Sequence, residues 1–198
     1  MPKKWSDIQG WFSDRDADFA SGLCRSARPG VVVEIGVLRG RATAVMAPLC
    51  RDGGCAYHAV DNFRGGSDPG DPAAAAQRTE RVLTSFRRNM KSLGLWDYIT
   101  VHKSDSSAAS AIFPDGSVEL CFIDADHTFE GVTRDMEAWW PKIRPGGAMA
   151  GHDYRHTRKH GVRPAVDAFA ARAGLPVGHG RLLRRSQRHC CWAVRRPG

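Results

Sequence analysis

Short apolar runs alternate with amphipathic segments over most of the chain. Five runs are rich in β-branched and other apolar residues, as expected of strands buried on both faces of a sheet: residues 31–36, 57–61, 98–102, 118–123 and 148–151. The segments that follow them predict helices over residues 42–49, 77–93, 108–113, 128–140 and 162–173. Strands that alternate with helices predict an α/β fold with a doubly wound, mostly parallel sheet.

The last part of the chain departs from this alternation. Residues 178–196 predict an antiparallel hairpin at one edge of the sheet, with Leu182 and Leu183 on its first arm. The Arg-Pro-Gly-Gly sequence at residues 144–147 predicts a turn that leads into the fifth strand.

Length and composition indicate one globular domain. The chain has 198 residues, of which 42% are hydrophobic and 25% charged. We expect an N-terminal helical cap segment at residues 1–27 and a core at 28–198. No apolar run approaches the roughly 18 to 20 residues that span a bilayer. The six cysteines form no C-x-x-C pair, so we expect reduced thiols and a cytoplasmic protein without membrane contact.

The net charge of +8 is unevenly distributed. Basic residues concentrate near the C-terminus: Arg181, Arg184, Arg185, Arg188, His189, Arg195 and Arg196. One interpretation is a surface that binds nucleic acid. The other is a pair of edge strands whose arginines prevent edge-to-edge association and bind no partner. The sequence leaves both interpretations open.

Polar residues stand where the predicted strands end. Six acidic side chains and two histidines occupy these positions, within residues 34–36, 61, 104–106, 124–127 and 152–154. In an open α/β sheet, ligands bind beyond the carboxyl ends of the strands. Clustered carboxylates repel one another unless a cation or a polar ligand compensates their charge. The pattern therefore predicts a ligand site at this edge.

The first two strand ends indicate the kind of ligand. Gly36 and Gly40 allow the backbone to approach a ligand, but their spacing is not the G-x-G-x-x-G that holds a pyrophosphate. Asp61 ends the second strand, where a carboxylate can accept hydrogen bonds from both hydroxyls of a ribose. These residues predict a nucleoside ligand that lacks a pyrophosphate.

The chain resembles the class I S-adenosylmethionine-dependent methyltransferases, and within them the small-molecule branch of macrocin-type O-methyltransferases and cephalosporin-hydroxylase relatives. The resemblance covers nearly the whole chain and rests on several segments in order. These are residues 8–13, 33–43, 60–61, 122–132, 135, 139–141, 145–147 and 151–154. It implies a Rossmann-like methyltransferase domain.

The resemblance also implies roles in cofactor binding. Glu34, Gly36 and neighbouring backbone, with Gly40, would hold the methionine part of S-adenosylmethionine. Asp61 would hold the ribose. The adenine would lie beside Ser104, Asp105 and Ser106, and Asp124 would complete the cofactor site.

The Gly10-Trp11 segment would fold over the cofactor. Alternatively, Trp11 and Phe12 form a hydrophobic staple at a helix start.

In the macrocin-like relatives, a divalent metal is held by an aspartate that ends the fourth strand and by an acidic pair that ends the fifth. Here these positions carry Asp124, His152 and Asp153. Because His152 replaces an acidic residue and magnesium prefers oxygen ligands, manganese or another imidazole-tolerant metal is an alternative to magnesium. His152 and Asp153 could instead be a hydrogen-bonded pair that orders the next loop.

The relatives use a histidine three residues after the first aspartate to remove the proton of the acceptor hydroxyl. His127 matches this base, and Asp124 is its expected catalytic partner. The alternative for His127 is a ring at a helix N-terminus that bonds a neighbouring carboxylate. Asp126 is expected as the N-cap of the same helix rather than as a ligand.

These assignments predict methylation of a small-molecule hydroxyl, with a sugar or secondary metabolite as acceptor and with a divalent metal assisting. A methyltransferase that acts on RNA or another polyanion, and a non-catalytic cofactor-binding module, are the alternatives. Acceptor specificity is expected to lie in the loops at residues 62–72 and 155–160. The aromatic N-terminal segment either mediates a homodimer or folds back on its own chain.

Overall fold

The computed structural model describes residues 1–64, 80–155, 161–178 and 190–198. Within them, six strands form one sheet in the order β3-β2-β1-β4-β5-β6. The strands are β1 (Val31–Ile35), β2 (Ala56–Asp61), β3 (Ile99–Lys103), β4 (Val118–Ile123), β5 (Ile143–Gly151) and β6 (Trp192–Arg195). The first five are parallel to their neighbours, and β6 is antiparallel to β5. This sheet confirms the predicted fold class.

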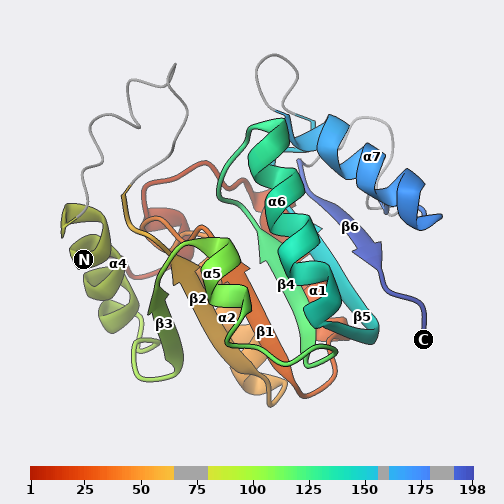
Figure 1. The fold of residues 1–198 in the computed structure, drawn as a ribbon. Coiled ribbons are helices and arrows are strands. Elements are labelled where there is room, and N and C mark those ends of the chain that lie inside the picture. The colour runs from red at the N-terminus through yellow and green to blue at the C-terminus, as the bar shows by residue number, and fades with distance from the viewer. Residues whose placement is uncertain (65–79, 156–160, 179–189) are drawn as a thin grey trace.

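Helices cover both faces of the sheet. They are α1 (Asp14–Ser26), α2 (Thr43–Asp52), α4 (Glu80–Ser92), α5 (Ser106–Ser110), α6 (Phe129–Trp139) and α7 (Val162–Ala173), with short 3-10 turns η1 (Trp5–Asp7) and η2 (Trp140–Lys142). The apolar side chains of α1, α2 and α4 pack in one hydrophobic cluster, and those of α5, α6 and α7 in another. Figure 1 shows α5 and α6 in front of the sheet and α2 behind it.

The apolar runs of the sequence form strands because both faces of the sheet are covered. All six residues of β4 are buried, and successive side chains enter opposite clusters. Leu120 and Phe122 contribute to the cluster under α1 and α2, whereas Cys121 and Ile123 contribute to the one under α6. The central strands therefore hold their carboxyl ends in fixed positions.

Helix α1 is part of this packing. Ser13 is its N-cap and forms a reciprocal capping box with Asp16. Ala17, Ala20 and Cys24 on its buried side pack in the same cluster as α2. The chain before the helix is thereby brought against the sheet.

One predicted turn is wrong. Residues 144–147 lie inside β5, although they include a proline and two glycines. The pairing of β4 with β5 shifts in register between Val118 and Leu120, so the extra residues are accommodated as an irregularity of the strand. The flanking residues Ile143 and Ala148 pair with β4, and Gly146 and Gly147 exchange backbone hydrogen bonds with Arg196, so tertiary contacts hold this local turn sequence within the strand.

Some helix and strand boundaries also differ from those predicted. Helix α5 begins at Ser106 instead of residue 108, because the carboxylate of Asp105 accepts a hydrogen bond from the Ser107 N–H and caps the helix. The second arm of the predicted hairpin is β6, while Leu182 and Leu183 lie outside the described residues. No helix in the described parts of the chain is both long and apolar enough to cross a membrane.

Candidate active site

The carboxyl ends of four neighbouring strands lie side by side. In the parallel registers, Ile35 of β1 is level with Val60 of β2 and with Ile123 of β4, and Ile123 is level with Gly151 of β5. The residues that follow these positions therefore meet at one edge of the sheet. This edge carries most of the side chains that the sequence singles out.

Gly36 follows β1 in a conformation that favours glycine. Its φ is +84°, and its N–H donates to the carbonyl oxygen of Val60 at 2.8 Å. A Cβ atom at this position would lie 2.1 Å from the carbonyl oxygen of Asp124. The loop after β1 can pass the end of β4 only because residue 36 has no side chain.

Gly40 also has a positive φ, but its surroundings differ. A Cβ atom there would lie 2.6 Å from Cε of Met90 and 3.0 Å from the Phe86 ring. Both side chains belong to α4, so close packing of this helix accounts for the glycine. Its role in cofactor binding stays a prediction.

Asp61 at the end of β2 binds two loops through its carboxylate. One oxygen accepts the Leu38 N–H at 2.9 Å, and the other accepts the Phe63 N–H at 2.6 Å. Leu38 and Phe63 both have positive φ, at 48° and 54°, which is a strained conformation for side chains of this size. Burial raises the pKa of Asp61, although these backbone donors act against that shift. Each oxygen keeps a second lone pair, so the predicted ribose contact is compatible with these bonds.

The structure places Glu34 away from the open edge. Its side chain is buried, and Oε2 accepts hydrogen bonds from the Thr43 hydroxyl at 2.6 Å and the Tyr57 hydroxyl at 2.7 Å. Burial raises the pKa of Glu34 to about 8. These contacts tie β1 to α2 and β2, so direct contact of Glu34 with the methionine part of a cofactor stays an untested prediction.

The predicted adenine segment follows β3. Asp105 caps α5, and the Ser106 hydroxyl accepts a hydrogen bond from the indole N–H of Trp139 at 3.0 Å. Ser106 also lowers the pKa of Asp135, a buried carboxyl on α6 whose Oδ1 has no hydrogen-bond partner among the described residues. Burial is the larger influence and raises the pKa of Asp135 to about 6.

We predict that Asp135 makes stability fall with rising pH. Its carboxyl has a pKa of 3.8 in the unfolded reference and about 6 in the fold, so the folded state binds the proton more tightly. The associated stability is present below about pH 4 and is lost as pH rises through about 6, which amounts to about 2–3 kcal/mol. Asp135→Asn should flatten this fall in urea unfolding at pH 4.5 and 7.5, whereas Asp18→Asn on the exposed side of α1 should not. Parallel curves for wild type and Asp135→Asn would contradict the prediction.

The N-terminal segment is held against the sheet by Arg41. Its guanidinium donates to the backbone oxygens of Ser6, Ile8 and Phe12 at 2.5–3.0 Å and lies 4.9 Å above the Trp5 ring. The Phe12 side chain is buried, as the staple interpretation expects, whereas Trp11 is 68% exposed. The proposed contact of Trp11 with a cofactor stays a prediction.

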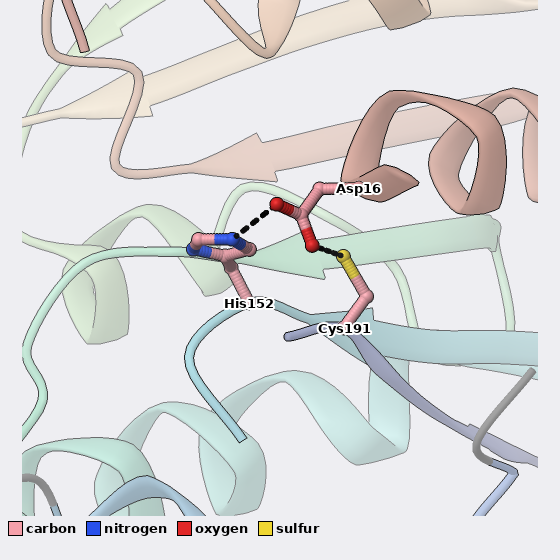
Figure 2. Close-up of side chains that lie close together, drawn as sticks. All are labelled: Asp16, His152 and Cys191. Atoms are coloured by element: carbon pink, nitrogen blue, oxygen red, sulfur yellow. Dashed lines mark hydrogen bonds and ion pairs between the residues drawn. The ribbon is translucent and has the colours of Figure 1, made fainter. Parts of the chain in front are cut away.

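Phe12 leads into a buried polar cluster at the end of β5. Its ring lies 5.4 Å from the ring of His152. Nε2 of His152 lies 3.3 Å from Oδ2 of Asp16, and Oδ1 of Asp16 lies 3.6 Å from Sγ of Cys191 (Figure 2). All three side chains are buried and come from α1, the end of β5 and the start of β6.

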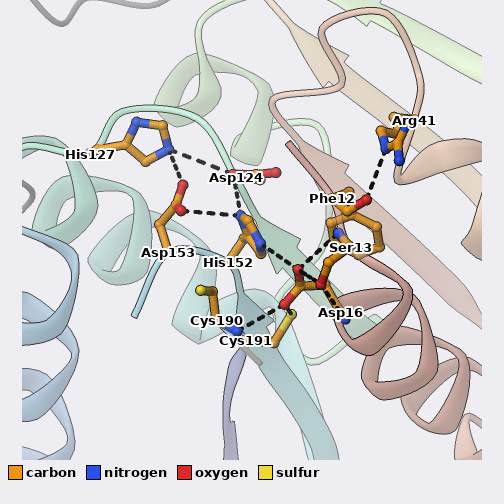
Figure 3. A network of polar contacts seen from close by, with 10 residues as sticks. All are labelled: Phe12, Ser13, Asp16, Arg41, Asp124, His127, His152, Asp153, Cys190 and Cys191. Atoms are coloured by element: carbon orange, nitrogen blue, oxygen red, sulfur yellow. Dashed lines mark hydrogen bonds and ion pairs between the residues drawn. The ribbon is translucent and has the colours of Figure 1, made fainter. Parts of the chain in front are cut away.

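The opposite nitrogen of His152 faces the open edge. Nδ1 lies 3.4 Å from Oδ1 of Asp153 and 3.7 Å from Oδ1 of Asp124 (Figure 3). Nε2 of His127 approaches the same two carboxylates, at 3.0 Å from Asp153 and 3.6 Å from Asp124. Asp153 has a φ of 60°, so the third strained non-glycine residue of the described chain also lies at this edge. The structure therefore brings His127, Asp124, His152 and Asp153 together, as predicted.

The charges of this cluster shift its pKa values. Burial alone would lower the pKa of His127, but hydrogen bonds to Asp124 and Asp153 outweigh it and raise the value to about 10. The pKa of His152 is likewise raised against the effect of burial, chiefly by Asp124. The pKa of Asp153 is lowered by both rings although burial opposes this. The cluster is thus a set of paired opposite charges as it stands.

Asp126 belongs to the helix start and not to this cluster. Its Oδ1 accepts the Thr128 N–H and the Thr128 hydroxyl, both at 2.8 Å. The N-cap of α6 is Thr128, whose hydroxyl accepts the Gly131 N–H. The prediction that Asp126 is the N-cap is wrong by two residues, because an aspartate can order the turn before a cap as well as occupy the cap.

Asp16 is the buried acid that sequence reasoning missed. The S-x-x-D spacing of Ser13 and Asp16 signals a capping box, and the structure contains one. The capping box is reason enough for an acid at position 16, so the sequence gives no sign of a contact with His152. It gives no sign either of Cys190, whose N–H donates to Asp16 from 174 residues away.

The basic C-terminal residues are only partly described. Residues 179–189, which include most of the arginines, lie outside the described residues. Arg196 is described, and its guanidinium donates to the carbonyl oxygens of Pro141 and Ile143 at 3.1 and 2.5 Å. The guanidinium of Arg196 thus has partners within the protein, and the two interpretations of the basic residues both stay predictions.

Comparisons with known proteins agree with this fold. A family model described as a methyltransferase domain matches residues 33–154. The solved structure of the O-methyltransferase NovP is similar over 93% of this chain and 80% of its own, at 20% identity and a TM-score of 0.68. The O-methyltransferase from Bacillus cereus in complex with SAH is similar over 96% and 86%, at 19% identity and a TM-score of 0.67. At these identities the structural likeness shows the fold.

Proposed function

The chain belongs to the methyltransferase-domain family, and from this premise we propose that it transfers a methyl group from S-adenosylmethionine to a hydroxyl group of a small molecule. One observation carries the proposal. The loop bound by Asp61 and the cluster of His127, Asp124 and Asp153 lie along the same edge of the sheet, so a nucleoside cofactor and a proton acceptor can adjoin. Similar structures include O-methyltransferases, which supports a hydroxyl acceptor.

Methyl transfer to a hydroxyl requires that the acceptor oxygen be aligned with the methyl group and that the hydroxyl lose its proton. The sulfonium of S-adenosylmethionine already activates its methyl group, so the enzyme must hold the acceptor oxygen in line with it. A hydroxyl is a poor nucleophile until its proton is removed. Asp61 and the Gly36 loop would fix the cofactor, and the cluster beyond β4 and β5 would act on the acceptor.

His127 is the proposed base, with Nε2 as the atom that takes the proton. Only the uncharged ring can do so, and its pKa of about 10 beside two carboxylates keeps the ring charged at neutral pH. The base role therefore requires that Asp124 and Asp153 bind another cation in place of the ring.

The residues at the end of β4 and β5 fit a divalent cation. One atom each from Asp124, His152 and Asp153 lies within 4.8 Å of the others, and two of the three residues are partly exposed. Two carboxylate oxygens and one imidazole nitrogen form a mixed donor set. A cation held there would lower the pKa of a bound acceptor hydroxyl.

Calorimetric titration with S-adenosylmethionine tests the cofactor. We expect micromolar binding to wild type and a loss of about 10- to 100-fold in Asp61→Ala, because a charged hydrogen bond to a ribose contributes about 1.5–3 kcal/mol. Asp61→Asn keeps one acceptor oxygen and can still accept one of the Leu38 and Phe63 N–H groups, so it should bind with intermediate affinity. Thermal unfolding of each variant checks that the fold is retained.

Absence of binding to wild type, with and without Mn²⁺, would contradict the proposed function. Where binding is found, a panel of sugars and phenolic or macrolide alcohols, with a labelled methyl group on the cofactor, would identify the acceptor class. Methyl transfer to RNA with none to the panel would instead favour a polyanion acceptor.

A further inference from the structure

His152 contacts carboxylates on both sides of its ring. Nε2 faces Asp16 at 3.3 Å, and Nδ1 faces Asp153 at 3.4 Å and Asp124 at 3.7 Å. Two groups of residues with suitable donor atoms therefore share this ring: Asp16, His152 and Cys191 on the buried side, and Asp124, His152 and Asp153 on the open side.

The buried group is already satisfied by protein atoms. Oδ1 of Asp16 accepts the Cys190 N–H at 2.8 Å, and Oδ2 accepts the N–H and hydroxyl of Ser13 at 3.0 and 2.5 Å. Burial raises the pKa of the Cys191 thiol well above its usual value, so the sulfur keeps its proton. With its acid bonded from three sides and its thiol protonated, this group is a support for His152 and not an ion site.

The open group is accessible to a cation, unlike the buried group. The Asp124 and Asp153 side chains are 23% and 15% exposed, so solvent and substrate can reach them. Within the described part of the chain, their carboxylates accept no backbone hydrogen bond and face the two histidine rings. A cation entering here would meet two anionic oxygens and, on displacing the proton of the charged ring, Nδ1 of His152.

We propose that Asp16 is the positioning residue of this centre: its buried carboxylate engages Nε2 of His152 and so presents Nδ1 as a metal ligand beside Asp124 and Asp153. Metal-binding histidines generally donate their other ring N–H to a carboxylate, which fixes both the tautomer and the orientation of the ring. Figure 3 shows this order, from Asp16 through His152 to Asp124 and Asp153. The inference rests on the metal-assisted form of the proposed function.

The same arrangement determines which cation binds. An imidazole locked among the ligands suits Mn²⁺, Co²⁺ or Zn²⁺, whereas Mg²⁺ prefers oxygen ligands in octahedral geometry. Because Asp16 and Phe12 both lie against the ring, His152 cannot simply turn away to make room for water. We therefore infer a centre that binds Co²⁺ or Mn²⁺ at least about 100-fold more tightly than Mg²⁺.

Calorimetric titration of the full chain with Mg²⁺, Mn²⁺ and Co²⁺ tests the role of Asp16. Asp16→Asn should weaken Co²⁺ and Mn²⁺ binding by about 10- to 100-fold, as loss of such supporting carboxylates does. Ser13→Ala removes the same capping box at a cost of about 1 kcal/mol in stability but leaves the His152 contact, so its metal affinity should equal that of wild type. Cys191→Ala should also bind as wild type does.

A charge-compensated pair of substitutions tests the selectivity. His152→Asp combined with Asp16→Asn gives the open group three carboxylates and avoids a buried acid pair behind them. The ratio of Co²⁺ to Mg²⁺ affinity should fall by at least about 10-fold in this double variant. In wild type loaded with Co²⁺, paramagnetically shifted histidine ring signals should appear in the NMR spectrum, and the signals of one ring should be lost in the double variant.

Three outcomes would overturn the inference. They are an equal loss of metal affinity in Ser13→Ala and Asp16→Asn, abolition of binding by Cys191→Ala, and a wild type that binds no divalent cation below millimolar concentration. None of these outcomes concerns S-adenosylmethionine binding, so the metal centre can be refuted without refuting the proposed methyl transfer. Conversely, absence of cofactor binding would refute the proposed function while leaving the metal titrations interpretable.

Discussion

Substitution of His127 by alanine is expected to lower kcat for methyl transfer by about 100- to 10,000-fold, the range that general bases contribute. The ring stands after β4 beside Asp124 and Asp153, where Nδ1 of His152 is the other imidazole nitrogen in contact with these carboxylates. Because His127 forms no part of the predicted cofactor site, the affinity for S-adenosylmethionine should change less than about threefold.

The measurement needs the acceptor identified by the labelled-methyl assay. Steady-state rates with wild type, His127→Ala and the control Glu130→Ala would be compared, together with calorimetric cofactor affinities. Glu130 is exposed in the first turn of α6, so its loss costs only the few tenths of a kcal/mol of a helix-dipole interaction. A His127→Ala enzyme with at least a third of the wild-type kcat would exclude His127 as the base.

Substitution of Gly36 by alanine is expected to lower the free energy of unfolding by more than about 4 kcal/mol, beyond the usual range for single substitutions. Two costs combine at this position. The positive φ of 84° is unfavourable for any residue with a Cβ, and the new Cβ would lie 2.1 Å from a backbone oxygen of Asp124. Since that oxygen belongs to the end of β4, the variant that does fold should also have lost cofactor affinity.

Gly116→Ala is the matched control. Gly116 has a similar φ of +70°, but nothing lies within 4 Å of the added Cβ. It should cost about 1–2 kcal/mol, the conformational part alone. Chemical unfolding of both variants separates the two costs, and equal losses in Gly36→Ala and Gly116→Ala would show that the contact with β4 is not what requires glycine at position 36.

The fold was open to prediction because its signals are local. A strand that is buried on both faces needs a mostly apolar run, and residues 118–123, apolar except for Glu119, form β4 in the structure. Helix α7 was likewise predicted with its observed bounds, Val162–Ala173. The turn predicted at residues 144–147 was wrong because proline and glycine are local turn signals, whereas hydrogen bonds to Arg196 and the paired residues on either side hold this segment in β5.

The site was open to prediction in part, since parallel strands bring their carboxyl ends to one edge. That rule places Asp61, Asp124 and Asp153 near one another from spacing alone, and the resemblance gave them roles. Spacing does not say which way a side chain points. Glu34 lies in β1, two residues before Gly36, yet its side chain turns into the core towards Thr43 and Tyr57.

By itself, the sequence determined the doubly wound sheet, the acidic edge and the departure from an all-carboxylate metal site at His152. Only the tertiary structure decided what His152 does, because its partners are remote in the chain. Asp16 satisfies a local capping box that hides its second contact, and Cys191 reaches it from 175 residues away. Long-range contacts of this kind depend on how α1 and β6 pack against β5, and that packing follows from burial of apolar surface throughout the domain rather than from any short motif.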